Sequence, residues 1–246
     1  ENIPLTKKNI NSYDHSLSLK TGEGLKTLSS YQKVLKLLIK NELNSKQLVF
    51  VAMGGGSLGD FVGFVASTYK RGCSLIHIPS TWLAAVDSAH GGKTALNFNE
   101  AKNQIGSFYF PNAVLVSKKL LLKQPKALLK SAMGEVAKTY LYDDQTQKLI
   151  DKKISSSEQL FKCLPVIIEA KYKVVRKDPY EIKKIRKVLN LGHTIGHVLE
   201  AYHKLPHGEA IKYGLGFSLQ WSFEKKYITE SSLKKLHKDL KSLFNI

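Results

Sequence analysis

The chain has 246 residues, enough for one large or two small domains with a substantial hydrophobic core. Hydrophobic residues make up 43% and charged residues 24%, as in ordinary globular proteins, and no apolar run is long enough to span a membrane. The N-terminal sequence ENIPLTKKNIN lacks the apolar stretch of a signal peptide, and Cys73 and Cys163 are too far apart to form a metal or redox pair. These features predict a cytoplasmic protein with two reduced thiols and no membrane partner.

The formal net charge of +18 is the unusual property of the composition. It suggests nucleic-acid binding, because lysine and arginine side chains that neutralise phosphates supply most non-specific affinity. The lysines are nevertheless spread through predicted helices, and no recognition motif or interleaving of aromatic and basic residues accompanies them. We therefore expect no nucleic-acid partner, and we attribute the charge to a small anionic substrate and a lysine-rich solvated surface.

The first half of the chain alternates predicted helices and strands. Helical spacing over residues 28–42 is followed by a short apolar run over 47–53, a glycine break and a helix over 59–69. Further strands are predicted at 73–78 and 113–116. A strand, a helix and a strand in this order predict parallel pairing by a right-handed crossover.

After Ser117 the pattern becomes helical, without a convincing strand. The predicted helices cover 125–143, 158–177, 185–201, 208–227 and 230–243. The sequence thus predicts an α/β nucleotide-binding domain with a parallel sheet over residues 1–117 and an all-α domain over residues 118–246. No internal repeat or low-complexity linker separates them.

A glycine run in MGGGSLGD lies between a predicted buried strand and a predicted helix. Backbone N–H groups and a helix N-terminus at this point could face an anion such as a pyrophosphate. The run departs from the GxGxxG dinucleotide fingerprint, and on its own it could be only a tight turn. Downstream, VDSAHGGKTALNFNEAKN carries the polar residues Asp87, Lys93, Lys102 and Asn103. This stretch could be a solvated loop, but the apolar residues 82–86 before it favour a segment that folds back over a cleft.

The stretch LNLGHTIGHVLEAYHKLPHGE contains four histidines, and three of them have a spacing that could form a site. His193 and His197 are four apart, so their imidazoles share one helix face, and His207 follows on the next segment. Such a set could close around a divalent metal if a carboxylate comes from elsewhere, although two histidines at this spacing are equally often ordinary residues of a polar face. Gly192 and Gly196 each cost about 1 kcal/mol against alanine in a helix, which predicts that something approaches closely there.

Several ordered segments resemble the 3-dehydroquinate synthase family. They are GGGSLGDFVGFVASTYKRG, IHIPSTWLAAVDSAHGGKTALN, AKNQIGSFYFP, GEVAK, RKVLNLGHTIGHVLE and LPHGEA. The resemblance implies an NAD-binding α/β domain, a helical domain that binds a divalent metal, usually Zn²⁺ with Co²⁺ as an alternative, and an active site between them. It also implies the shikimate-pathway reaction in which 3-deoxy-D-arabino-heptulosonate 7-phosphate becomes 3-dehydroquinate and phosphate. The steps implied are transient oxidation by NAD, phosphate elimination, re-reduction and an intramolecular aldol reaction.

The resemblance places the metal ligands at Glu135, His193 and His207, and it makes His197 a residue of the phosphate site. From residues alone, Glu135 and Lys138 are equally well explained as an i,i+3 ion pair. The implied substrate residues are Lys93, Asn103, Lys138, Lys171, Arg186, Asn190 and His197, with Arg71 reaching the phosphate from the other subunit of a homodimer. The implied cofactor residues are Glu23, Lys26, Gly55, Gly56, Asp60, Ser80, Thr81, Asp87 and Lys102.

Some features depart from the family's pattern. The family has further strands before this chain's first element and a further helical segment after its last, and His90 stands where an aliphatic residue is usual. Alanine replaces a usual glycine at 101 and lysine a usual threonine at 123. Two alternatives therefore stay open: another enzyme of the same architecture, either a sugar-phosphate cyclase or a metal-dependent alcohol dehydrogenase, and a catalytically weak remnant kept as a binding module.

Overall fold

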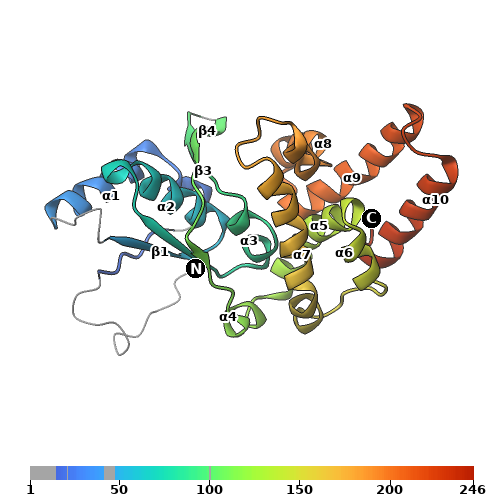
Figure 1. The fold of residues 1–246 in the computed structure, drawn as a ribbon, viewed down its shortest axis with the longest axis horizontal. Helices are drawn as coiled ribbons and strands as arrows, with labels where there is room; N and C mark the ends of the chain where they lie inside the picture. Colours follow the sequence, from blue (N-terminus) through green and yellow to red (C-terminus); the bar gives the residue numbers. More distant parts are fainter. Residues whose placement is uncertain (1–14, 21, 42–47, 100) are drawn as a thin grey trace.

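The computed structural model describes residues 15–20, 22–41, 48–99 and 101–246. The N-terminal sequence ENIPLTKKNIN, the end of the helix predicted over 28–42 and the start of the strand predicted over 47–53 lie outside the described residues. The molecule is elongated, with its strands in the N-terminal half and helices throughout the C-terminal half (Figure 1). The predicted fold class, an α/β region with a parallel sheet followed by a helical region, is confirmed.

The N-terminal half is built around a small parallel sheet. Its elements are η2 (Glu23–Leu25), α1 (Leu28–Lys40), β1 (Val49–Gly54), α2 (Gly56–Thr68), η3 (Tyr69–Arg71), β2 (Ser74–Pro79), α3 (Trp82–Val86), η4 (Ser88–His90), β3 (Lys93–Phe98), β4 (Ala101–Phe108) and β5 (Ala113–Val114). The strand order is β1-β2-β5, and both pairs are parallel, as the strand, helix and strand pattern predicts. Phe61, Val65 and Leu96 are buried in the local core, which joins α2 to the hairpin.

The stretch that begins at Lys93 forms an antiparallel β-hairpin, β3–β4, which the sequence did not reveal. Leu96 is fully buried, and a Cβ on Gly63 would come within 2.4 Å of the Thr94 side chain, so β3 packs directly on α2. The hairpin stands at the top of the view in Figure 1, on the side of the N-terminal half that faces α8. The expectation of a segment that leaves the core and folds back is thus met by strands rather than by a loop.

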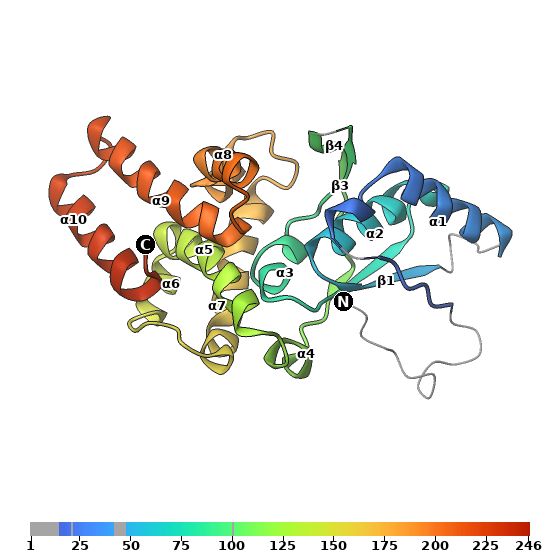
Figure 2. The same cartoon turned by 180° about the vertical axis from the view of Figure 1, so that it is seen from behind.

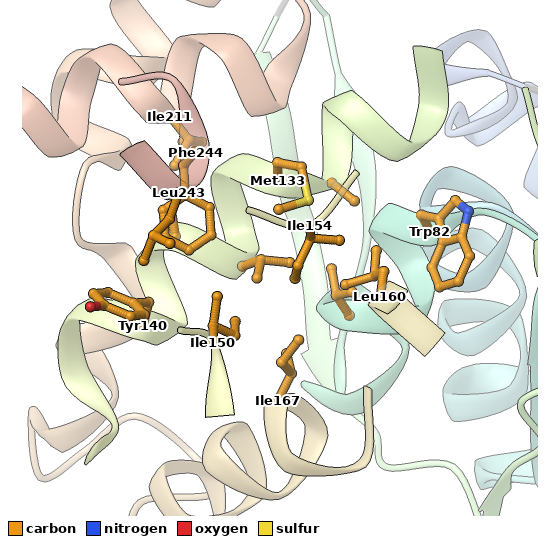
Figure 3. Close-up of a cluster of buried hydrophobic side chains, with 14 of the residues drawn as sticks. Trp82, Met133, Tyr140, Ile150, Ile154, Leu160, Ile167, Ile211, Leu243 and Phe244 are labelled. Atoms are coloured by element: carbon orange, nitrogen blue, oxygen red, sulfur yellow. The ribbon is translucent and has the colours of Figure 1, made fainter. Parts of the chain in front are cut away.

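The C-terminal half is a bundle of helices around α5. Its elements are α4 (Lys118–Leu122), α5 (Lys126–Tyr142), α6 (Asp144–Leu149), α7 (Ser157–Lys177), η5 (Ile185–Asn190), α8 (His193–His203), α9 (His207–Glu224), α10 (Glu230–Asp239) and η6 (Leu240–Phe244). The main core runs from Tyr140 and Phe244 at one end to Trp82 at the other (Figure 3). Because Trp82 belongs to α3, the core of the helical half extends into the N-terminal half.

The prediction of a single helix over 185–201 is wrong. The segment is a 3₁₀ helix, η5, then a break at Leu191 and Gly192, and then α8. Gly192 has a φ of +79°, a left-handed conformation that glycine adopts without steric cost and that redirects the chain. Figure 2 shows α8 lying against α9 at the edge of the bundle.

None of the helices in the described ranges is both long enough and apolar enough to cross a membrane. Cys73 and Cys163 are both free thiols, as expected.

Candidate active site

Glycines bring three helices together where the predicted metal ligands lie. Glu135 on α5 and His207 on α9 each have a glycine next to them, and a Cβ on Gly208 would come within 1.7 Å of the Ser131 carbonyl oxygen. The same holds between α8 and α9, because a Cβ on Gly214 would lie 1.9 Å from the carbonyl oxygen of Gly192. Helix α9 therefore approaches Gly192 and Gly196, the glycines beside His193 and His197. The close approach expected from the sequence is explained by the packing of α8 on α9.

The predicted ligands converge on one carboxylate. Glu135 Oε1 lies 3.1 Å from His207 Nε2 and 3.6 Å from His193 Nε2, and the Glu135 side chain is 1% exposed. All three ligand atoms lie within 4.8 Å of one another. His193 Nδ1 lies 3.2 Å from the Leu191 carbonyl oxygen, so its proton sits on Nδ1 and the Nε2 lone pair faces the site. A second group, formed by His197, Glu200 and His207, also lies within 4.8 Å.

This donor set fits a divalent metal. Two imidazole nitrogens and one carboxylate oxygen are the ligand types of a catalytic zinc site, which keeps a position open for substrate. Burial alone lowers the pKa of His207, but hydrogen bonds to Glu135 and Glu200 raise it to about 9. A cation is therefore favoured between His207 and Glu135, and a bound metal ion would take the place of the Nε2 proton.

Buried lysines surround this carboxylate and link it to Asp87. Lys138 forms ion pairs with Glu135 and, at 3.5 Å, with Asp87, while Lys171 Nζ lies 2.8 Å from Asp87 Oδ1. Burial raises the pKa of Asp87, but Lys138 and Lys171 outweigh it and hold the net pKa well below the usual range. Burial lowers the pKa of Lys171, whereas Asp87 and Glu135 overcome burial and raise that of Lys138. The site is thus a dense array of fixed charges of the kind suited to a leaving dianion.

A pocket opens at the N-terminus of α2. Gly55 is the N-cap residue of this helix, and a Cβ on Gly56 would lie 3.0 Å from the Ser88 hydroxyl oxygen. The pocket is lined by Ala52, Gly54, Gly55, Gly56, Gly59, Asp60, His77, Pro79, Ala84, Ser88 and Ala89. Free N–H groups at a helix N-terminus, together with a lining that side chains would fill, fit the pyrophosphate of a dinucleotide.

The predicted cofactor residues Glu23, Lys26 and Asp60 form a polar cluster beside this pocket. Lys26 is 2% exposed, and its Nζ donates to Asp60 Oδ2 at 2.8 Å and also to the Asn103 side chain. Glu23 accepts hydrogen bonds from Ser57 and from Asn97. Ser80 is buried, and the Thr81 side chain caps α3 by accepting from the backbone N–H of Ala84.

The structure brings only some of the predicted substrate residues together at the site. Arg186 is 2% exposed, so it is not part of a solvated basic run, and its guanidinium donates to the carbonyl oxygens of Gly91 (2.8 Å) and Pro179 (2.6 Å). Asn190 lies four residues further on, where an α-helix would place it on the same face as Arg186, but η5 is a 3₁₀ helix and Asn190 is exposed. Lys93 lies at the surface, where it pairs with Glu181 at 2.5 Å.

Arg71 lies away from this array. It is exposed in the turn after α2, whose 13 residues span about 20 Å, so it sits at the other end of that helix from the pocket. The structure therefore does not bring Arg71 to the site of its own chain.

Sequence reasoning missed two polar side chains at the site. Glu200 contacts both His207 and Lys102, and its position three residues after His197 on a helix was the available signal. His77 lines the pocket, and its buried Nε2 has no hydrogen-bond partner among the described residues. No sequence signal marked His77, which reads as an ordinary strand residue.

Two protein-family models match the chain, one over each half. The family model described as 3-dehydroquinate synthase N-terminal matches residues 16–131, and the one described as 3-dehydroquinate synthase C-terminal matches residues 132–244. The chain belongs to the 3-dehydroquinate synthase family. A 3-dehydroquinate synthase from Alkaliphilus oremlandii is 39% identical over 86% of this chain and 60% of its own length. One from Thermoplasma volcanium is 40% identical over 81% of this chain and 56% of its own length.

Solved structures give the same architecture. A 2-deoxy-scyllo-inosose synthase complexed with carbaglucose-6-phosphate, NAD⁺ and Co²⁺ superposes with a TM-score of 0.81 at 31% identity, covering 93% of this chain and 64% of the other. A 2-epi-5-epi-valiolone synthase from Streptomyces hygroscopicus, with a TM-score of 0.76 at 22% identity, shares the fold. An iron-containing alcohol dehydrogenase shares it more loosely, with a TM-score of 0.55. The chain spans about three fifths of the length of the synthases from Alkaliphilus oremlandii and Thermoplasma volcanium.

Proposed function

We propose that the chain carries 3-dehydroquinate synthase activity, converting 3-deoxy-D-arabino-heptulosonate 7-phosphate to 3-dehydroquinate and phosphate with NAD and a divalent metal. The observation that supports it best is the buried Glu135 carboxylate, which faces two imidazole nitrogens and lies next to Lys138. A dehydrogenase needs the metal and the cofactor, but it has no need of buried lysines placed for a leaving phosphate. We also propose a cytoplasmic location, in keeping with the two free thiols.

Each part of the site has a role in this proposal. Glu135, His193 and His207 would hold the metal, and the pocket at the α2 N-terminus would hold the NAD pyrophosphate. When bound, the metal supplies a Lewis acid and NAD supplies a reversible hydride acceptor. Lys138 and His197 provide a cation and a hydrogen-bond donor on the side where the resemblance places the phosphate.

The remaining substrate contacts extend the same scheme. Lys93 and Asn103 complete the phosphate side, and Lys171, Arg186 and Asn190 bind the ring and the carboxylate of the substrate. Asp87 is positioned by Lys171 through both its carboxylate and its backbone carbonyl oxygen, at 2.8 and 2.6 Å. This arrangement holds an ionised carboxylate between the cofactor side and the metal side of the site. The residues assigned to the cofactor are Glu23, Lys26, Gly55, Gly56, Asp60, Ser80, Thr81, Asp87 and Lys102.

The experiment is a phosphate-release assay on the purified chain with the heptulosonate phosphate as substrate. We expect phosphate only when both NAD and Zn²⁺ are present, and we expect chelation followed by Zn²⁺ or Co²⁺ addition to abolish and restore it. Glucose 6-phosphate and sedoheptulose 7-phosphate are the matched controls, because neither carries the carboxylate. Release from one of these in preference to the heptulosonate phosphate would instead identify another sugar-phosphate cyclase. Release from none of the three would contradict the proposed activity.

A further inference from the structure

Glu200 on α8 contacts residues of both halves of the molecule. Its Oε2 lies 3.1 Å from His207 Nδ1, and its Oε1 lies 2.8 Å from Lys102 Nζ. Lys102 belongs to the hairpin strand β4, 98 positions away in the sequence. The Glu200 side chain is 22% exposed, so both of its oxygens are placed at the inner side of α8 rather than in open solvent.

The two contacts leave the Glu200 carboxylate with a defined orientation. Lys102 holds Oε1 by a charged hydrogen bond, which leaves Oε2 to accept the Nδ1 proton of His207. With Nδ1 protonated in this way, His207 presents Nε2 to Glu135, 3.1 Å away. A carboxylate that accepts the second ring N–H of a metal-binding histidine fixes its tautomer and its ring orientation.

We infer that Glu200 is a positioning residue, which aims His207 Nε2 at the metal position and ties this histidine to the β3–β4 hairpin through Lys102. The inference rests on the metal site of the proposed function. The second possible ligand group, which contains His197 and Glu200, does not fit as well. Lys102 already occupies one Glu200 oxygen, and His197 is exposed, whereas Glu135 is buried between two Nε2 atoms.

The test is the Zn²⁺ dissociation constant, measured by competition with a chromophoric chelator. Removing the outer partner of a metal-binding histidine weakens metal binding about 10- to 100-fold, and we expect this loss for Glu200→Ala. Glu200→Gln should lose less, because its amide oxygen can still accept the Nδ1 proton. Lys102→Met should also lose less than Glu200→Ala, because the contact between Glu200 and His207 remains. Thermal unfolding of the metal-free proteins would establish that each variant is folded.

Glu209→Gln is the matched control. Glu209 lies two residues from His207 and pairs with Lys212 at 3.2 Å, so it is a similar ion-paired carboxylate without a contact to the histidine. We expect its Zn²⁺ affinity to equal that of the wild type. The absorption bands of the Co²⁺-loaded proteins add a second readout, because a reoriented His207 changes the ligand field.

Four outcomes would overturn the inference. Unchanged Zn²⁺ affinity in Glu200→Ala would leave the metal site standing but remove the role of Glu200. An equal loss in Lys102→Met would mean that Glu200 acts by joining the two halves and not through His207. An equal loss in His197→Ala would make Glu200 a ligand of the second group. A wild type that binds no Zn²⁺ would remove the proposed metal site and this role together.

Discussion

His197 and His207 have similar places in the sequence but different surroundings. His207 is held between two carboxylates, whereas His197 is exposed, with its ring 5.2 Å from that of His193. We therefore predict that His207→Ala loses bound metal, while His197→Ala keeps its metal and loses phosphate-release activity. Elemental analysis of both proteins, beside the activity assay, checks this. The reverse pattern would contradict the ligand assignment.

Arg186 gives a second prediction at the scale of the residue. Its guanidinium is buried, and we propose that it binds the substrate carboxylate, so removing it would take away a desolvated charge partner, a loss that typically costs about 2 to 5 kcal/mol. We predict that Arg186→Ala lowers kcat/KM for the heptulosonate phosphate by about tens- to thousands-fold with metal content unchanged. Lys187→Ala, at the neighbouring exposed position, is the control that should behave like the wild type. Normal turnover by Arg186→Ala would contradict the carboxylate assignment.

The sequence alone predicted the metal ligands but not the side chains that orient them. The resemblance points to Glu135, His193 and His207, and the structure places their ligand atoms together. The contacts of Glu200 could not be derived from spacing, because they depend on where α9 and the hairpin come to lie beside α8. The exposure of Asn190 could not be derived from spacing either, because it depends on η5 being a 3₁₀ helix and not an α-helix.

At the scale of the element, helices α5 and α9 cross closely because Gly134 on α5 and Gly208 on α9 have no side chains. A Cβ on Gly208 would overlap the Ser131 carbonyl oxygen at 1.7 Å, and no side-chain movement can relieve a clash with backbone. Because such overpacking typically costs about 1 to 3 kcal/mol or more, we predict that Gly208→Ala lowers the free energy of unfolding by at least this amount and weakens metal binding. Urea denaturation and Zn²⁺ titration measure the two effects.

Gly216 on the same helix is the matched control for this substitution. A Cβ there would meet nothing within 4 Å, so Gly216→Ala should gain up to about 1 kcal/mol from helix propensity. If both variants had the same stability, the close crossing would not be what Gly208 provides.

His90 makes folding sensitive to mild acid. Burial lowers its pKa to about 4, although the hydrogen bond that Nε2 donates to the Ala85 carbonyl oxygen acts in the opposite direction. The other ring nitrogen, Nδ1, accepts from the Tyr172 hydroxyl. As the pH falls from about 6.5 to 4, the unfolded chain binds a proton here that the folded chain does not, so folding loses stability, by at most about 3 kcal/mol. We predict that His90→Leu loses less stability between pH 7.5 and 5 than the wild type does, as measured by urea midpoints. Equal losses would contradict this.

Some secondary-structure elements of the fold could be predicted from the sequence, and others could not. The positions of the strands and of the long amphipathic helices were predicted because their periodicity is local. The burial expected for the strand over 47–53 was wrong, because Val49 and Val51 of β1 are exposed. The hairpin was missed because its strands do not alternate in burial: three consecutive residues of β3 are buried against α2, and the first four residues of β4 are exposed. The break at Gly192 was missed because its cause is the backbone of α9. These last two errors concern contacts between segments that are distant in the chain.

At the scale of the whole molecule, Arg71 stands apart from every other predicted site residue. Lys70, Arg71 and Gly72 have φ values of +49°, +71° and +117°, and non-glycine residues adopt such backbone conformations uncommonly. The turn displays an exposed guanidinium at the end of α2 remote from the pocket. The phosphate role that the resemblance implies for Arg71 would therefore have to be played in another molecule, and we propose a homodimer in which each subunit completes the other's site.

Mixing two inactive variants tests this sharing. In a hybrid of Arg71→Ala and Lys93→Ala subunits, one of the two sites receives an intact arginine and keeps an intact lysine, while the other site lacks both. Random exchange makes half of the dimers hybrid, so an equal mixture should recover about a quarter of the wild-type activity. Lys70→Ala is the control at the neighbouring exposed position and should be active without mixing. No recovery after demonstrated subunit exchange would show that Arg71 does not act across a dimer.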